Sequence, residues 1–340
     1  VQDSLAEGQS LLVFFTAVRY TYAFLLSKDK YTYWEVKPPI KKFQTDVAKL
    51  LTGWGNFEQN KELKLDDLSD KWRAPARDIM SALVKSSKAD FTKTLDELVI
   101  VPDGMLWYIP FEALPVSEGD RSESLIDKVR VRYAPTVGLA VGDARRRKPG
   151  GNMAVVLGRL FPRDDAPIID MGFQDIARAI PEATAIRGKL PVGGALYSSL
   201  FDRLIVLSEI APSAPGYDWR TWQTAGNTVG GTLGQWFSLP FGGPEQVILP
   251  GFRTPAERGL NKFPKELAGQ ELFLATCGLM ATGARTVLIS RWRTGGQTSI
   301  DLMREFAQEL PHTTASDAWQ RSVQLISHTE VNAAAEPRLK

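Results

Sequence analysis

The stretches DRLIVLSEI (residues 202–210) and QVILPGFRT (residues 246–254) decide the fold that we predict for this chain. Each contains a short, continuous apolar run, without the alternation expected of a strand that has one face in water. Similar runs occur at residues 154–157 and 286–289. Strands of this kind are buried on both faces, so the four runs together predict a parallel sheet between two layers of helices.

Helical patterns separate most of these strands. Apolar residues recur in them at a spacing of three or four, which places them on one face of a helix. The candidate helices cover residues 172–180, 195–201, 272–282, 300–310 and 315–327. We therefore predict an α/β core over residues 151–340, in which helices sandwich a mostly parallel sheet.

The first 150 residues have another pattern, which predicts an accessory α+β part. The stretch ELVIVPDGMLWYIPFEAL (residues 97–114) predicts a buried strand, a Pro-Asp-Gly turn and a second short strand that ends at Pro110, which together form a hairpin. Gly104 supplies the positive φ that such a turn needs. Strands are also predicted at residues 11–16, 20–26 and 31–36, and helices at residues 40–51 and 72–84.

The composition is that of a globular protein. The chain is 44% hydrophobic and its formal net charge is +2, so its charge predicts neither a nucleic acid nor an acidic membrane as partner. The most apolar stretch, residues 11–26, contains Arg19 and is shorter than the roughly 20 residues that span a bilayer. The single cysteine, Cys277, fits a reducing compartment, and we expect a cytoplasmic protein. Because the chain begins at Val1 without an initiator Met, we expect it to be a piece of a longer polypeptide.

Three stretches together resemble the CHAT family, whose members are relatives of caspases and separase. They are residues 97–114, residues 202–210, and GARTVLISRWRTGG (residues 283–296) followed by LMREFAQEL (residues 302–310). Their order and spacing extend the resemblance over residues 5–326. The resemblance implies a caspase-like α/β fold, in which a His ends one strand, a Cys ends the next, and substrate binds across the carboxyl ends of the strands.

This chain departs from the family where the resemblance places the catalytic pair. Ser208, Glu209 and Ile210 stand where the family has Thr-His-Gly, and residues 250–254 stand where it has Ser-Ala-Cys-Glu-Thr. Glu209 therefore replaces the general base and Phe252 replaces the nucleophile, so we predict no catalytic residue. The predicted degenerate cleft consists of Ser208, Glu209, Gly251, Phe252 and Arg253.

Cys277 could serve as nucleophile only if the active site were shifted. It lies in ELFLATCGLMATGAR (residues 271–285), whose spacing predicts a buried helix, and a lone cysteine there is usually a small core residue. The two histidines, His312 and His328, both follow Cys277, whereas the family's His precedes its Cys. We predict His312 in a turn between helices and His328 near the end of the last helix.

Motifs of other enzyme classes are absent. The sequence has no Walker P-loop, no GxGxxG turn after a strand, no HExxH, no CxxC and no GxSxG. Neighbouring carboxylates such as Asp66 with Asp67 and Asp164 with Asp165 are typical of solvated turns. We therefore predict no metal site and no cofactor.

Two hypotheses of function remain open. The first is a catalytically inactive CHAT-like domain that binds a protein or peptide, or acts as a scaffold; the resemblance implies an attached helical-repeat region as one such partner. Trp219, Trp222 and Trp236 are its candidate partner surface, and Glu209 and Arg253 could form an ion pair across the cleft. The alternative is a cysteine peptidase of the caspase-like class, with a shifted active site or one completed by a partner chain.

Overall fold

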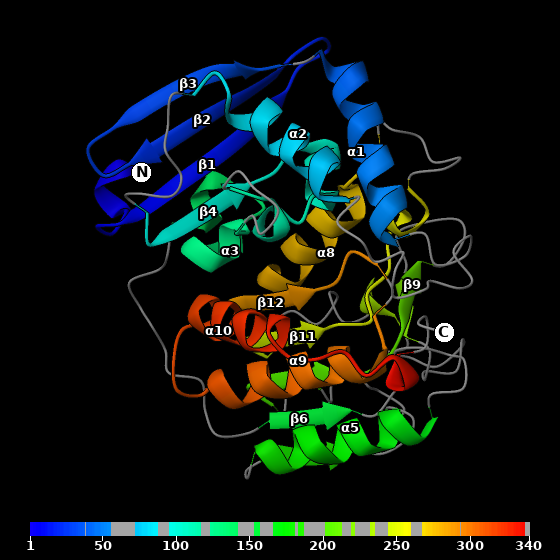
Figure 1. The fold of residues 1–340 in the computed structure, drawn as a ribbon. Coiled ribbons are helices and arrows are strands. Elements are labelled where there is room, and N and C mark those ends of the chain that lie inside the picture. Colours follow the sequence, from blue (N-terminus) through cyan, green and yellow to red (C-terminus); the bar gives the residue numbers. More distant parts are fainter. Residues whose placement is uncertain are drawn as a thin grey trace. The chain divides into compact units, whose positions relative to one another are not determined.

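The structure is a computed structural model, and its elements group into two compact units (Figure 1). Unit 1 is built from residues within 1–146 and 258–270, and unit 2 from residues within 147–257 and 271–340. The residues that the structure describes are 1–37, 39–55, 72–87, 95–116, 123–141, 153–156, 166–180, 183–186, 201–212, 219–221, 232–234, 244–259, 267–292 and 294–336.

Unit 1 contains a mixed five-stranded sheet in the order β3-β2-β1-β4-β5. The first three strands form an antiparallel meander, and β4 and β5 run parallel to β1. The indole of the buried Trp34 donates to the carbonyl of Leu83 at 2.7 Å, which fixes β3 to α2. The elements of unit 1 include β1 (Gln9–Thr16), β2 (Thr21–Ser27), β3 (Tyr31–Val36), α1 (Ile40–Gly55), α2 (Arg73–Val84), β4 (Glu97–Val101), α3 (Leu125–Lys128), β5 (Arg130–Tyr133) and α4 (Val137–Ala140).

The prediction of a hairpin around the Pro-Asp-Gly turn was wrong. Gly104 has the expected positive φ of 55°, but a 3-10 helix, η4 (Gly104–Tyr108), follows β4 in place of a second strand. The physical reason is the place of β4 in the sheet. Because β1 and β5 already pair with its two edges, a returning strand has no free edge to bind. The apolar residues after Gly104 are instead buried as a compact helical turn.

Unit 2 contains the predicted parallel sheet. Its five strands lie in the order β12-β11-β8-β6-β7, and each described pair is parallel. All four side chains of β8 and of β11 are buried, as the continuous apolar runs predicted. The strands are β6 (Met153–Val156), β7 (Ala183–Ile186), β8 (Arg203–Val206), β11 (Gln246–Leu249) and β12 (Thr286–Ile289).

Helices cover both faces of this sheet. Val155, Ile205 and Ile248 form one core cluster with apolar side chains of α5 (Ala166–Ala179), α9 (Gly296–Glu309) and α10 (Ala315–Ser327). The crossover from β11 to β12 through α8 (Gln270–Ala281) runs in the opposite direction to the crossover from β6 to β7 through α5. Since such crossovers are right-handed, α8 and α5 lie on opposite faces. Unit 2 is therefore an α/β sandwich.

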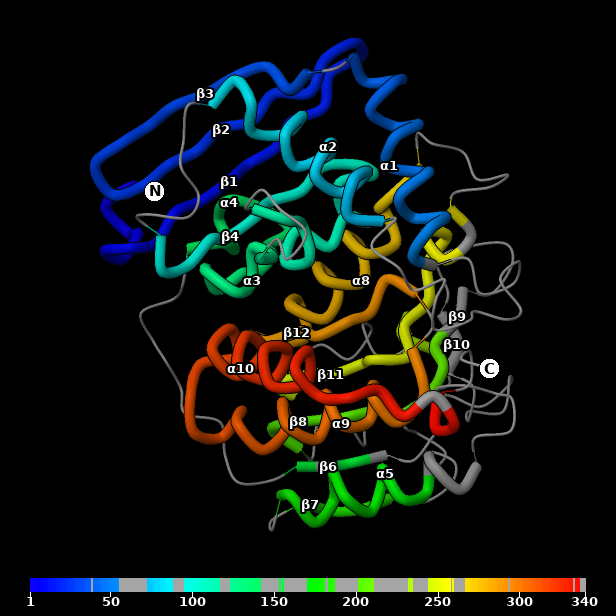
Figure 2. The backbone as a smooth tube through the Cα atoms, viewed as in Figure 1, coloured from blue at the N-terminus to red at the C-terminus, as the bar shows by residue number. Residues whose placement is uncertain are grey.

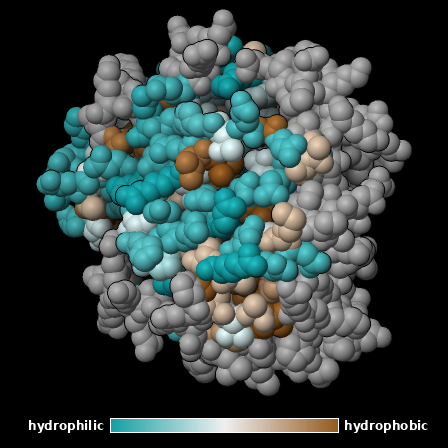
Figure 3. Space-filling model, turned by 60° about the horizontal axis from the view of Figure 1, so that its bottom comes forward, coloured by the Kyte–Doolittle hydropathy of each residue, from teal (hydrophilic) through white to brown (hydrophobic). Residues whose placement is uncertain are grey.

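Most predicted strands and helices are present within a few residues of their predicted bounds, and α10 has the predicted bounds of 315–327. The sequence prediction missed β7 and two short strands, β9 (Ile210–Pro212) and β10 (Trp219–Thr221). Residues 195–200 of the helix predicted at residues 195–201 lie outside the described residues. In the part of the chain that is described, no helix has the length and apolar character that crossing a membrane requires. The coloured residues in Figure 3 are mainly hydrophilic, with hydrophobic ones in small separate areas.

Candidate functional site

The structure brings the predicted cleft residues together at one edge of the unit 2 sheet. Strands β8 and β11 are parallel neighbours, so the residues that follow them leave the sheet side by side. The amide of Ile210 donates to the carbonyl of Gly251 at 2.9 Å, and the amide of Arg253 donates to the carbonyl of Ile210 at 2.9 Å. Glu209 and Phe252 consequently lie at the carboxyl ends of adjacent strands, which is where parallel α/β sheets bind their ligands.

The side chains at this edge are buried. Phe252 is 0% exposed, Ser208 is 1% exposed and Glu209 is 4% exposed. The ring of Phe252 is thus part of the core of the unit. Within the predicted degenerate cleft, the side chains of Ser208, Glu209 and Phe252 therefore do not face solvent.

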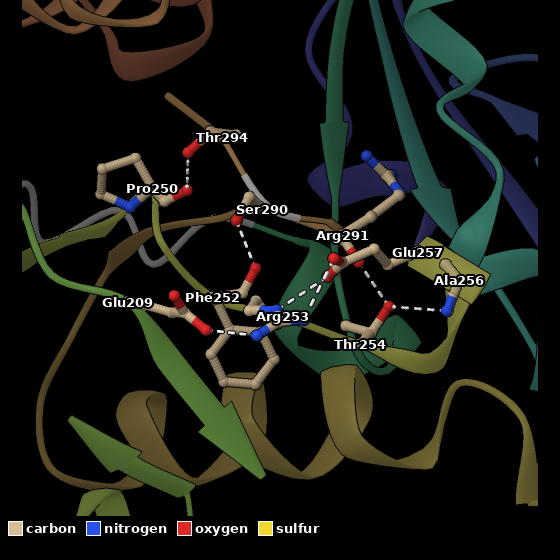
Figure 4. A network of polar contacts seen from close by, with 10 residues as sticks. All are labelled: Glu209, Pro250, Phe252, Arg253, Thr254, Ala256, Glu257, Ser290, Arg291 and Thr294. Atoms are coloured by element: carbon tan, nitrogen blue, oxygen red, sulfur yellow. Dashed lines mark hydrogen bonds and ion pairs between the residues drawn. The ribbon is translucent and has the colours of Figure 1, made fainter. Parts of the chain in front are cut away.

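A buried cluster of three charges holds the two strand ends together (Figure 4). The Arg253 guanidinium donates to both carboxylate oxygens of Glu257, Nε to Oε2 at 2.8 Å and Nη2 to Oε1 at 3.0 Å. Its Nη1 donates to Oε1 of Glu209 in a close contact. The ion pair that the sequence suggested between Glu209 and Arg253 is therefore present, and Glu257 is a member that the sequence analysis missed.

Arg253 remains charged in this cluster. Burial by itself would lower its pKa, but the hydrogen bonds and charges of Glu257 and Glu209 outweigh that effect and raise the pKa above the ordinary value of arginine. The side chains of Arg253, Glu209 and Glu257 are 15%, 5% and 2% exposed. With such burial, their attraction is screened far less than that of a surface ion pair.

The loop after β12 supports the loop after β11 through a series of hydroxyl groups. Ser290 Oγ donates to the carbonyl of Phe252, and Thr294 Oγ1 donates to the carbonyl of Pro250. Thr254 Oγ1 donates in turn to the carbonyl of Arg291. Together with the backbone bonds of Ile210, these hydroxyl bonds join three neighbouring strand ends and leave the backbone of residues 250–254 little freedom (Figure 4).

Cys277 and the two histidines occupy positions unlike those of a catalytic pair. Cys277 lies on α8, His312 is exposed in the turn between α9 and α10, and His328 is the exposed residue that ends α10. Burial raises the pKa of the Cys277 thiol, whereas a catalytic cysteine has its pKa lowered by a neighbouring cation or imidazolium. The arrangement therefore disfavours the thiolate that nucleophilic attack requires.

The rate of alkylation measures directly how readily the Cys277 thiol ionises. Because the thiolate is the reacting species, iodoacetamide should modify Cys277 of the folded chain more slowly than free cysteine at neutral pH. The rate should still rise with pH above about 8.5, the ordinary pKa of cysteine. The urea-unfolded chain serves as control and should react like free cysteine. Rapid alkylation of the folded chain near pH 6 would contradict the raised pKa.

The predicted tryptophan surface is only partly described. Trp219 lies in β10, which pairs in antiparallel fashion with β9, the strand that begins directly after Glu209. Trp222 and Trp236 lie outside the described residues. Within the described ranges, no three His, Cys, Asp or Glu side chains converge in a way that could hold a metal ion.

Comparison with protein families adds the evolutionary context. Residues 73–214 match the model of the CHAT domain, a match that covers less than half of the chain. This part of the chain resembles the CHAT domain. Two of the three stretches that suggested the resemblance, residues 97–114 and 202–210, lie inside the match, and Glu209 lies inside it as well. The mixed α/β structure with its parallel sheet between helices is consistent with the caspase-like fold of this family.

The match has a limit that bears on the site. It ends at residue 214, before β11, and so does not include Phe252 or Arg253. A search of curated proteins found no match to the chain.

Proposed function

We propose that this CHAT domain is catalytically inactive and acts by binding a protein or peptide at the carboxyl edge of the unit 2 sheet. The observation that carries the proposal is the buried cluster of Glu209, Arg253 and Glu257 at the ends of β8 and β11. In a caspase-like peptidase, this edge supplies a base and a thiolate. Here the two positions hold Glu209 and Phe252, and the described side chains form a charge cluster.

Two further properties of the site support an inactive domain. The Glu209 carboxylate is buried and bonded to Arg253, so it is not placed to contact a substrate or thiol. The aromatic ring at position 252 has no group that could attack a carbonyl, and it is fully buried. The chain uses these positions to stabilise the edge of the sheet.

Binding by strand addition suits this edge. In the described part of the chain, β10 pairs with β9 alone, in a sheet of two strands next to the site. An extended peptide that paired with such a strand would gain backbone hydrogen bonds without cleavage. The partners that we propose are a protein or peptide, including a helical-repeat region of the same polypeptide.

The test combines binding and cleavage on one set of peptides. We expect an array of random decapeptides to show saturable binding to the full chain, and fluorogenic versions of the bound peptides to be cleaved no faster than by the Cys277→Ala variant. N-methylation of alternate peptide amides is the matched control for the binding mode. It removes the donors that strand addition needs and leaves the side chains unchanged, so binding should fall about tenfold or more.

The alternative function makes the opposite prediction. If the chain is a cysteine peptidase with a shifted active site, cleavage should be measurable in the wild type and lost in Cys277→Ala. That result would overturn the proposed function. Absence of saturable binding to any peptide on the array would overturn the binding role.

A further inference from the structure

Helix α9 begins at the same edge of the sheet and has no cap of its own. It follows β12 after a short loop, and its N-cap residue is Gly295, which has no side chain to accept a hydrogen bond from the first turn. The first amides of a helix have no partner within the helix, and the helix dipole concentrates partial positive charge there. The start of this 14-residue helix therefore favours an acceptor or an anion supplied from elsewhere.

A carboxylate from a distant part of the chain occupies this position. The Thr298 amide donates to Oε1 of Glu336 at 2.7 Å, and the Thr298 hydroxyl donates to the same oxygen. Glu336 lies 38 residues further along the chain. In Figure 2, the red segment after α10 runs back alongside α9 to the end at which α9 begins. The first turn of α9 thus binds a carboxylate through a backbone amide and a hydroxyl, as an anion site does.

The described residues that precede Glu336 in this segment are mostly exposed. The side chains of Glu330, Val331, Asn332 and Ala334 are exposed. One backbone bond, from the Ala335 amide to the Asn332 carbonyl, lies within the segment and does not fix it to the sheet. A segment with little buried apolar surface opens locally at low free-energy cost. The carboxylate at α9 can therefore be exchanged without unfolding the unit.

We propose that the first turn of α9 is a binding subsite for a carboxylate side chain, that Glu336 fills it in cis, and that an acidic residue of a bound peptide takes the same place when the segment is displaced. The subsite adjoins the site described above, because Thr294, two residues before α9, is bonded to Pro250 after β11. The inference rests on the proposed function in one respect: it gives the chemistry of a peptide that binds this edge.

The experiment uses the chain's own sequence as the probe. A fluorescent peptide of residues 330–340, EVNAAAEPRLK, is titrated into the full chain and into its Glu336→Ala variant, and anisotropy is measured. We expect the variant to bind at least about tenfold more tightly than the wild type, because in the wild type the tethered Glu336 competes at high effective concentration. The same peptide carrying Glu336→Ala should bind the variant about tenfold more weakly, because it lacks the carboxylate.

Glu330→Ala is the matched control, since Glu330 is an exposed carboxylate on the same segment. This variant of the chain should bind the peptide as weakly as the wild type does. Amide hydrogen exchange gives a second readout: exchange at Thr298 should accelerate in Glu336→Ala and not in Glu330→Ala.

Two results would overturn the proposal. One is equal binding of the two peptides to the Glu336→Ala chain, including no binding of either up to about 1 mM. The other is unchanged exchange at Thr298 in that variant, which would show that Glu336 does not occupy the helix end in solution. Neither result bears on strand addition, so the array experiment can succeed when this one fails, and the two failures are distinguishable.

Discussion

Replacing Arg253 with methionine should destabilise unit 2 by about 3–5 kcal/mol, because the change removes the positive charge from between two buried carboxylates. Glu209 and Glu257 are 5% and 2% exposed, so water cannot replace the guanidinium at either of them. Since the chain forms two units, a single global unfolding transition is not assured. The measurement is therefore amide hydrogen exchange in β8 and β11 against urea concentration, which reports on unit 2.

Arg321→Met is the matched control for this prediction. Arg321 pairs with Glu309, but the two side chains are 62% and 39% exposed. Loss of such a surface pair should cost about 0–1 kcal/mol. Adding Glu209→Gln to Arg253→Met should recover part of the stability, because one of the two buried charges is then removed. Equal destabilisation by Arg253→Met and Arg321→Met would show that the cluster does not hold the strand ends together.

The sheet of unit 2 could be predicted from sequence because its inner strands β8 and β11 are buried on both faces. Residues 204–207 and 247–249 are apolar throughout, and no solvated strand has that pattern. The bounds of α10 were predictable because Thr314 caps the helix, accepting a hydrogen bond from the Asp317 amide, and an apolar periodicity follows. Local signals of this kind need no knowledge of the tertiary structure.

Elements that depend on the tertiary structure could not be predicted from the sequence. The run after Gly104 is apolar enough for a strand, and only the pairing of both edges of β4 shows that a second strand cannot form there. Strand β10 is three residues long, too short for a periodicity to appear. In both cases the deciding information lies in residues remote in sequence.

Some contacts of the candidate site could also be predicted from the sequence, and others could not. Glu209 and Arg253 could be predicted as partners because each follows a buried strand of the same parallel sheet. Glu257 was missed, although its spacing of four residues from Arg253 is a signal for an ion pair on one helical turn. The bonds from Ser290 and Thr294 to backbone carbonyls could not be predicted, because they require knowing that β12 lies next to β11.

Replacing Gly251 with alanine should destabilise unit 2 by about 3 kcal/mol, the upper end of the usual cost of overpacking. A Cβ at this position would lie 2.0 Å from the carbonyl oxygen of Ser208 and 2.7 Å from its carbonyl carbon. Both are backbone atoms, so no side chain can rotate away. Residues 208 and 251 would have to separate, which would stretch the hydrogen bond from the Ile210 amide to the Gly251 carbonyl.

Gly53→Ala is the control that separates this contact from the general effect of replacing a glycine. Gly53 lies in α1, and a Cβ added there meets nothing within 4 Å. Alanine should therefore stabilise helix α1 by about 0.5–1 kcal/mol, since glycine is the poorer helix former. The two variants are compared by hydrogen exchange in β8 and in α1. Because a Cβ at Gly251 would meet the backbone of Ser208, a neutral Gly251→Ala would mean that these strand ends can move apart freely. The edge of the sheet would then be flexible.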